Sequence, residues 1–187
     1  MVDLVREPHS DASAQPTATD WQSDLTTRSG YTFHVRPVSP ADEAALASFF
    51  THVGKDDLRF RFLTAIGTVG HDQLVRLVTV DHRHSENFLA CEIGSDRIIA
   101  SAMLAADDDG VRAEVAIAIR SDFKHRGISW TLLDHVARFA KAAGIRTLES
   151  IESRDNHAAI EMERERGWTA QSCPGDPSAM ILRLTLP

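Results

Sequence analysis

The sequence predicts a mixed α+β (mixed α/β) domain whose central, mostly antiparallel, twisted sheet has about seven strands flanked by helices. This prediction rests on the order of the periodic segments, on the turn sequences between them and on the composition. The chain has 187 residues, of which 43% are hydrophobic and 25% charged. That length and composition suit one globular domain with a core of its own.

The N-terminal part differs in composition from the rest. Residues 1–28 mix proline, serine, threonine and glutamine with acids, and no apolar period is visible. Such a segment buries too little apolar surface to offset the entropy lost on ordering. We therefore expect a disordered or loosely packed tail over 1–28, with Trp21 as its one residue suited to docking, and a folded domain over 29–187.

The domain is expected to open with a strand and a helix. Residues 31–37 alternate and are rich in strand formers. Ser39 and Pro40 are typical of a helix start, and Gly54 ends that helix. Two further helical segments are predicted, at 56–63 and 71–79.

Three segments rich in strand formers follow, at 87–93, 97–105 and 112–119. Short runs of glycine and aspartate separate them, so they should form an antiparallel meander. The remaining predicted elements are a helix over 127–143, a strand over 146–152, a helix over 156–167 and strands over 168–173 and 179–186.

Composition also bounds the function. A net charge of −7 argues against a nucleic-acid surface. Cys91 and Cys173 both fall in strand-like runs and are interpreted as buried thiols in a reducing compartment. No apolar run approaches the roughly 18 residues that span a bilayer, and the N-terminus lacks an apolar signal core. We expect a cytoplasmic protein with no membrane and no nucleic-acid partner.

A metal site is not expected. His82 and His84 lie two residues apart beside Asp81. No further histidine, cysteine or carboxylate stands at a helical or hairpin spacing that would complete the ligand set.

The strand, loop and helix over 112–144 carry most of the functional argument. A strand that enters a helix through a short, basic, glycine-containing turn can bind a phosphate, because the first N–H groups of the helix lack partners and its dipole is positive there. Gly127 lets the backbone approach a ligand closely. The loop residues are Lys124, His125, Arg126, Gly127, Ile128 and Ser129.

The order of elements and two motifs together resemble the GNAT superfamily of acyl-CoA-dependent N-acyltransferases over about residues 29–187. The first motif is the loop 124–129, which is similar to the superfamily's Gln/Arg-x-x-Gly-x-Gly/Ala loop. The second is NHAAIEMERERGW over 156–168. The resemblance implies the GNAT fold, with the fourth and fifth predicted strands splayed apart, and acetyl-CoA as cosubstrate with no metal.

Within that superfamily the chain is most similar to the bacterial Pat-type protein lysine acetyltransferase domain. The similar segments are FHVRPVSPADEAAL, DDLRFRFL and RAEVAIAIRSDFKHRGIS. Lys124 and Ser129 depart from the loop pattern. Glu163 stands where many superfamily members have a tyrosine that acts as general acid, which Pat-type domains also often lack.

The resemblance assigns further residues to acetyl-CoA. The pantetheine amides pair with a strand edge in this superfamily, which implies the backbone of Ile117, Ala118 and Ile119. Asn156 resembles an asparagine that contacts the cofactor, and a helix N-cap is an equally good reading of it.

Glu114 is the predicted general base. An amine acceptor must lose a proton before it attacks the thioester, and a carboxylate on a mostly apolar strand can take that proton directly or through a water. Glu114 shares the smaller face of its strand with Ala116 and Ala118, and it matches the base of Pat-type enzymes. Glu149 and Glu152 on the next strand are alternatives.

The sequence thus favours an N-acetyltransferase that moves acetyl from acetyl-CoA to a primary amine, with a protein lysine as the favoured acceptor. A small-molecule amine acetyltransferase and a non-catalytic acyl-CoA-sensing domain stay open as alternatives. We expect a monomer or a homodimer.

Overall fold

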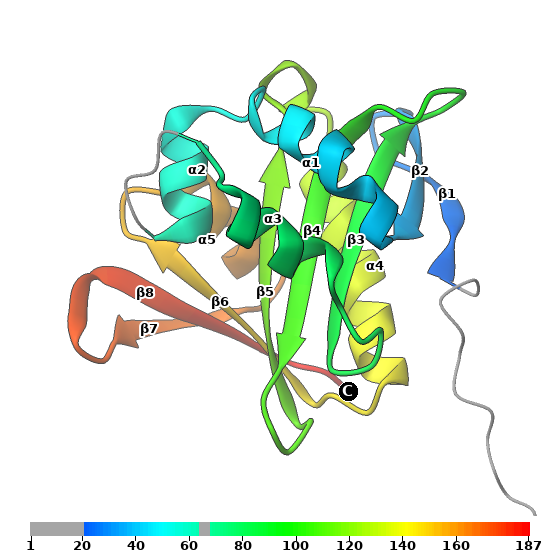
Figure 1. The fold of residues 1–187 in the computed structure, drawn as a ribbon. Helices are drawn as coiled ribbons and strands as arrows, with labels where there is room; N and C mark the ends of the chain where they lie inside the picture. The colour runs from blue at the N-terminus through cyan, green and yellow to red at the C-terminus, as the bar shows by residue number, and fades with distance from the viewer. Residues whose placement is uncertain (1–20, 64–67) are drawn as a thin grey trace, which may run out of the picture.

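The computed structural model describes residues 21–63 and 68–187 as one mixed sheet covered by helices on both faces (Figure 1). The strands are β1 (Ser23–Thr26), β2 (Thr32–Pro37), β3 (Ser85–Glu92), β4 (Ile98–Ala106), β5 (Arg112–Ile119), β6 (Thr147–Ser153), β7 (Thr169–Cys173) and β8 (Asp176–Thr185). The α-helices are α1 (Glu43–Phe50), α2 (Lys55–Phe62), α3 (His71–Val78), α4 (Ile128–Ala142) and α5 (His157–Glu165). Short 3-10 turns occupy Pro40–Asp42 and Ser121–Phe123.

The sheet has eight strands in the order β1-β2-β3-β4-β5-β6-β8-β7. Every neighbouring pair is antiparallel except β5 and β6, which run parallel. The predicted meander of three strands is confirmed as β3, β4 and β5, because the intervening glycine and aspartate turns are too short for anything but hairpins.

Two hydrophobic clusters lie on opposite faces of the sheet. Phe88, Leu104 and Val115 point toward α4 and α5, where they pack with Leu132 and Ile160. The other face carries α1, α2 and α3, whose apolar residues pack over Leu89 and Ala118. Because side chains alternate along a strand, β5 contributes Val115 to one cluster and Ala118 to the other.

The expected N-terminal boundary is wrong in one respect. Residues 23–26 form β1, which pairs with β2 from Ser23 opposite Val35 to Thr26 opposite Thr32. Trp21 docks edge-on against His135 and Phe139 of α4, with ring centroids 5.8 and 5.2 Å apart. The segment has no period, but the edge of β2 supplies backbone hydrogen bonds and α4 supplies an apolar surface. Residues 1–20, for which a tail was also expected, lie outside the described residues.

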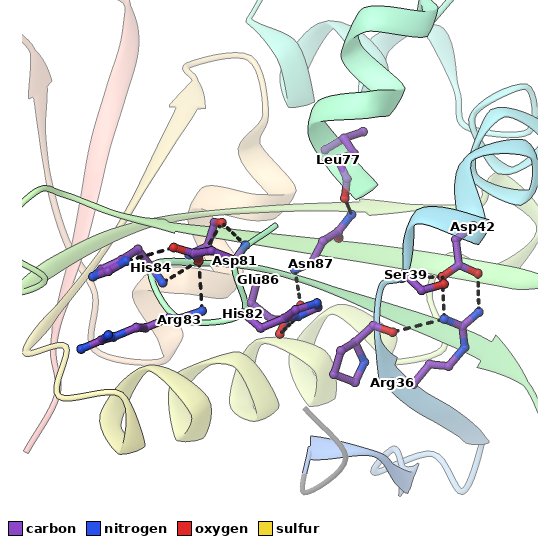
Figure 2. A network of polar contacts seen from close by, with 12 residues as sticks. Arg36, Ser39, Asp42, Leu77, Asp81, His82, Arg83, His84, Glu86 and Asn87 are labelled. Atoms are coloured by element: carbon purple, nitrogen blue, oxygen red, sulfur yellow. Dashed lines mark hydrogen bonds and ion pairs between the residues drawn. The ribbon is translucent and has the colours of Figure 1, made fainter. Parts of the chain in front are cut away.

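A polar network fixes the start of β3 (Figure 2). Asn87 is fully buried, donates to Leu77 O at 2.9 Å and accepts from Ser101 Oγ at 2.8 Å. Next to it, the buried carboxylate of Glu86 accepts from His82 Nδ1 at 2.9 Å. His84 turns instead to Asp81, at 3.0 Å. The two histidines that suggested a metal are therefore each paired with a different carboxylate.

Within the described ranges, no group of three or more histidine, cysteine or acidic residues is placed to hold a metal ion. Cys91 is buried and Cys173 half-buried, and both are free thiols. Among the helices of residues 21–63 and 68–187, none is both long and apolar enough to cross a bilayer.

The parallel pair β5 and β6 separates after a short ladder. The ladder joins Arg112 to Thr147, Ala113 to Leu148 and Glu114 to Glu149, and no further pair follows. β6 then continues with β8, while β5 stays with β4, so the two strands diverge toward α2 and α5 (Figure 1). The predicted splay of the fourth and fifth strands is confirmed.

Candidate functional site

A cavity of about 240 Å³ lies where β5 and β6 separate. Its walls come from β5 on one side, from β6 and α5 on the other, from α2 and from the loop that enters α4. The predicted site residues that line it are Glu114, Ile117, Ala118, Ile119, Lys124, His125, Ser129 and Asn156.

Glu114 lies at the point where the β5–β6 ladder ends. Its backbone pairs with Ala105 on one side and Glu149 on the other, so its position on the strand is fixed. Its side chain is solvent-exposed and also lines the cavity. An exposed carboxylate at the entrance of a cavity can exchange protons with both solvent and a bound amine.

The next residues of β5 offer a free strand edge to the cavity. Ile117, Ala118 and Ile119 pair with Ala102, Ser101 and Ala100 of β4. Their opposite edge has no partner on β6 within the described residues, because the ladder stops at Glu114. An extended ligand with amide groups can hydrogen-bond there as an added strand would.

The loop before α4 presents a run of backbone N–H groups. From Lys124 through Trp130, no backbone N–H donates to an acceptor within residues 21–63 and 68–187; the first such bond is Thr131 N to Gly127 O. His125 and Gly127 take φ values of 62° and 80°, which turn successive N–H groups outward. Together with the N-terminus of α4, this arrangement can bind an anion such as a pyrophosphate.

Side chains of the same loop have different surroundings. Ile128 is 1% exposed and belongs to the core, so only its backbone can serve a ligand. Arg126 is exposed, lies over Phe123 at 4.6 Å and over Tyr31 at 5.2 Å, and does not line the cavity. Lys124 is held by Asp57 of α2, with a nitrogen to oxygen distance of 2.6 Å.

The N-terminal hairpin braces this loop from behind. Ser29 Oγ donates to Arg126 O at 3.0 Å. A Cβ at Gly127 would lie 3.4 Å from Cβ of Thr27, so glycine suits both the positive φ and the close approach. Sequence reasoning missed this contact because residues 27–29 lie about a hundred positions upstream and carry no periodic pattern.

Asn156 is at the N-cap position of α5, but its side chain does not cap the helix. Its Nδ2 donates instead to Glu152 Oε2 at 2.6 Å across the cavity wall. Burial and, after it, the nearby charge of Glu163 raise the pKa of Glu152 to about 8, although the hydrogen bond from Asn156 and the charge of Arg61 act against the rise.

Glu163 is the most buried acidic residue on the wall. It is 4% exposed and accepts from Ser150 Oγ at 2.6 Å. Burial raises its pKa to about 7, although the Ser150 hydroxyl favours the charged form. In the sequence, position 163 stood out only because it lacks the tyrosine of many superfamily members. Nothing in the sequence indicated that the Glu163 side chain is buried.

Glu149, the other alternative base, has a different role. Its carboxylate forms ion pairs with Arg183 of β8 and, at 3.8 Å, with Arg112 of β5. It does not line the cavity. Glu152 is therefore the only one of these two alternatives with access to a bound ligand.

Helix α2 contributes a wall that the sequence did not assign. Arg61 and Phe60 line the cavity. Burial lowers the pKa of the Arg61 guanidinium, while the nearby charges of Glu114 and Glu152 act against that lowering. The segment DDLRFRFL was distinctive in the sequence, yet neither its spacing nor its polarity showed which face α2 turns to the sheet.

The site combines three chemical elements. A run of N–H groups can bind a pyrophosphate, a free strand edge can bind an amide-containing chain, and carboxyl groups at the far end can accept or give protons. Their order along the cavity suits a long substrate that has a phosphate group at one end and a reactive group at the other.

Comparison with known proteins agrees with this geometry. The family profile described as the acetyltransferase (GNAT) family matches residues 55–168. An acetyltransferase of Pseudomonas aeruginosa is 27% identical over 154 residues, which cover 81% of this chain and 83% of that protein.

Two solved structures share the fold. The GNAT domain of PAT from S. lividans superposes with a TM-score of 0.84 at 23% identity, covering 91% of this chain and 100% of that one. A suggested acetyltransferase from Salmonella typhimurium, solved with its cofactor acetyl-CoA, gives a TM-score of 0.66 at 17% identity, covering 83% and 94% of the two chains. The splayed sheet is thus a fold in which acetyl-CoA has been seen bound.

Proposed function

Because this chain belongs to the acetyltransferase (GNAT) family, we propose that it transfers the acetyl group of acetyl-CoA to a primary amine, and that the acceptor is a protein lysine. The observation that carries the proposal is the cavity between β5 and β6, which has free loop N–H groups at one end and Glu114 at the other.

The phosphate end of acetyl-CoA is assigned to the backbone of residues 124–129. Gly127 allows the approach, the side chain of Lys124 adds positive charge, and the imidazole of His125 lies beside it on the loop. Lys124 contacts a phosphate in one of two ways: it breaks its ion pair with Asp57, or it binds the phosphate while that ion pair stays intact. The pantetheine amides are assigned to the β5 edge at 117–119, and Asn156 lies across the cavity from that edge.

Glu114 is assigned the role of general base. It removes a proton from the acceptor amine, whose nitrogen then attacks the thioester carbonyl directly. A backbone N–H of β5 near Ile117 stabilises the negative charge that develops on the carbonyl oxygen. No nucleophilic side chain takes part, and the free thiols of Cys91 and Cys173 have no role in the transfer.

A protein lysine is favoured because Glu114 lies at the surface rather than deep in the cavity. A lysine on another protein carries its amine on a long flexible stem, so it reaches an exposed base without the rest of that protein entering. The similarity to Pat-type domains supports the same acceptor.

The proposal is tested by turnover. Purified protein is mixed with acetyl-CoA and with separate panels of basic proteins, peptides and small amines, CoA release is followed, and products are identified by mass spectrometry. Acetylated lysines support the proposal. Acetylation of small amines alone indicates a small-molecule enzyme, and acetyl-CoA binding by calorimetry without any CoA release indicates a sensing domain.

The role of Glu114 has its own test. Glu114→Gln should lower kcat by about 100-fold or more, because a well-placed general base contributes roughly that factor. The acid limb of the pH profile should disappear as well, while the dissociation constant for acetyl-CoA stays unchanged. Glu165→Gln, an exposed carboxylate on α5, is the control. Equal kcat and equal pH profiles for the two variants would refute the assignment.

The proposal also includes the setting. The protein is placed in the cytoplasm, where acetyl-CoA is available and free thiols stay reduced. It acts as a monomer or homodimer without nucleic acid, membrane or metal, and light scattering of the purified protein with and without acetyl-CoA measures its oligomeric state.

A further inference from the structure

The guanidinium of Arg61 is a half-buried cation on the cavity wall, and the proposed transfer gives it no role. Helix α2 lies against both β5 and β6, so Arg61 reaches the cavity where the two strands separate. Its guanidinium lies over the ring of Phe62, 5.1 Å from the centroid, and forms no hydrogen bond or ion pair within residues 21–63 and 68–187. Burying a charge without a partner is unfavourable, which is why burial lowers the pKa of this group.

The partner that suits Arg61 is an anionic group of a ligand. A guanidinium presents five N–H donors in a planar fork, which matches a carboxylate or a phosphate. Glu114 and Glu152 are near enough for their charges to act on Arg61, but in the described part of the chain neither carboxyl group bonds to it. Glu114 is exposed to solvent, and Glu152 accepts from Asn156 at 2.6 Å. The fork therefore stays available to a group that enters the cavity.

The two buried carboxyl groups on the wall do little to repel such an anion near neutral pH. Burial and the nearby charge of Glu163 raise the pKa of Glu152 to about 8, and burial raises the pKa of Glu163 to about 7. Each is therefore protonated in part or in full at pH 7, and a protonated carboxyl group can donate a hydrogen bond to a carboxylate. Lys124, a cation on the same wall, is already paired with Asp57. Arg61 is thus the cation left to bind an entering anion.

The position of Arg61 indicates which reactant carries the anion. The phosphates of acetyl-CoA are assigned to the loop 124–129, at the other end of the cavity. A lysine acceptor brings an amine on a four-carbon stem and no negative charge. The remaining part is the acyl group, which the proposed arrangement places between Glu114 and the β5 backbone near Ile117. An acetyl group offers the guanidinium no acceptor, whereas an acyl chain that ends in a carboxylate does.

We propose that Arg61 selects acyl-CoA donors whose acyl chain ends in a carboxylate, of the succinyl class, over neutral acyl chains of the same length. The inference rests on the proposed transfer to a lysine and deepens it, because it names the class of acyl group. Acetyl-CoA enters the same cavity but leaves the guanidinium without a partner.

The transfer of such a group balances in atoms and charge. The lysine nitrogen forms a bond to the thioester carbonyl carbon, and the carbon–sulfur bond breaks with its electron pair on sulfur. The amine proton passes to Glu114 and then to solvent, from which the CoA thiolate takes up a proton. The terminal carboxylate takes no part in the bond changes, so Arg61 binds it equally before and after the transfer.

The test compares succinyl-CoA with butyryl-CoA, which has the same number of acyl carbons and a methyl group in place of the terminal carboxylate. In wild type, kcat/KM for succinyl-CoA should exceed that for butyryl-CoA by about tenfold or more, because hydrogen bonds to a charged group contribute roughly that factor. Arg61→Met removes the cation and keeps a long apolar side chain, so the ratio should fall to about one.

The control is Arg59→Met, on the same helix. The side chain of Arg59 is 43% exposed and does not line the cavity, so the variant should keep the wild-type ratio. Both donors react with the same amine and the same base. A merely structural role of Arg61 would therefore lower both values of kcat/KM and leave their ratio unchanged.

Calorimetry of wild type with each donor, without an acceptor, keeps the test decisive if Arg61→Met folds poorly. Equal dissociation constants and equal kcat/KM for the two donors overturn the inference while acetyl transfer stands. A preference for succinyl-CoA that persists in folded Arg61→Met also overturns it. A loss in Arg61→Met that appears only with acceptors bearing a carboxylate assigns the anion to the acceptor and overturns it too. Wild-type protein that acylates no amine with any donor refutes the proposed function, whereas the calorimetric comparison still tests Arg61.

Discussion

At the scale of single residues, the site depends on side chains that meet different neighbours from those their motifs suggest. Asn156 occupies an N-cap position, yet its amide binds Glu152 rather than the helix backbone. Lys124 stands in a phosphate loop but is paired with Asp57. In both residues a partner from another element, invisible in the local sequence, decides the function of the polar group.

Gly127 is the residue on which the phosphate loop depends most directly. Gly127→Ala should destabilise the protein by about 1 kcal/mol, since a left-handed backbone is unfavourable for a residue with a Cβ. It should also weaken acetyl-CoA binding, because the new methyl group lies against Thr27 and shifts the loop. Calorimetric titration and denaturant unfolding measure the two effects.

The control for Gly127→Ala is Gly144→Ala. Gly144 has a φ of +87°, similar to the +80° of Gly127, but a Cβ there meets no atom within 4 Å. The stability loss should be similar and the acetyl-CoA affinity unchanged. Equal affinities in the two variants would show that loop geometry does not limit binding.

At the scale of elements, the N-terminal strand links the sheet to the cofactor loop. β1 extends the sheet beyond β2, Trp21 packs against α4, and Ser29 holds the carbonyl of Arg126. A segment that has no period of its own is therefore ordered by three surfaces that the rest of the chain provides.

Trp21 tests that role. Trp21→Ala should lower the free energy of unfolding by about 3 kcal/mol, as expected for a large aromatic residue removed from a packed site. Trp21→Phe should be nearly neutral, because it keeps the ring contacts with His135 and Phe139 and removes an indole N–H that has no partner in the described part of the chain. Unfolding in urea measures both, and equal stability of the alanine variant and wild type would show that docking contributes little.

At the scale of the whole molecule, buried titratable groups give the domain opposing responses to pH. Burial holds the pKa of His135 at about 4 and raises that of Glu163 to about 7. The folded state thus prefers a neutral histidine and a neutral carboxyl group. Lowering the pH from 6.5 to 4 therefore costs stability through His135, and raising the pH from 4.5 to 7 costs stability through Glu163.

The His135 contribution has a definite sign. Its pKa in the unfolded chain is about 6.5, so between pH 6.5 and 4 the unfolded state binds more protons and stability falls as the pH is lowered. The shift corresponds to about 3 kcal/mol at pH 4. His135→Leu removes this titratable group. As the pH falls from 6.5 to 4, the free energy of unfolding of the variant should therefore rise relative to wild type by up to about 3 kcal/mol.

Urea unfolding of wild type and His135→Leu at pH 7.5 and at pH 4.5 measures the difference between them. A difference in unfolding free energy that is the same at both pH values would contradict the burial of a neutral His135. Any constant difference between the two proteins then reports only the change in packing.

The sequence alone determined the fold because each helix and strand is specified by residues that are close together in the chain. The alternation in β3 to β5, the turns between them and the apolar face of α4 each predict their own structure from neighbouring residues. Local patterns also placed Glu114 on its strand and residues 124–129 at the start of a helix. The order of the elements and motifs indicated the GNAT family, to which the chain belongs.

Only the tertiary structure decided which groups meet. It brought Arg61 from α2, Glu152 from β6 and Glu163 from α5 to one cavity, and it turned Glu149 away toward Arg183. It also placed β1 in the sheet. The physical reason is that burial and charge pairing depend on contacts between residues far apart in the chain, which no local period records.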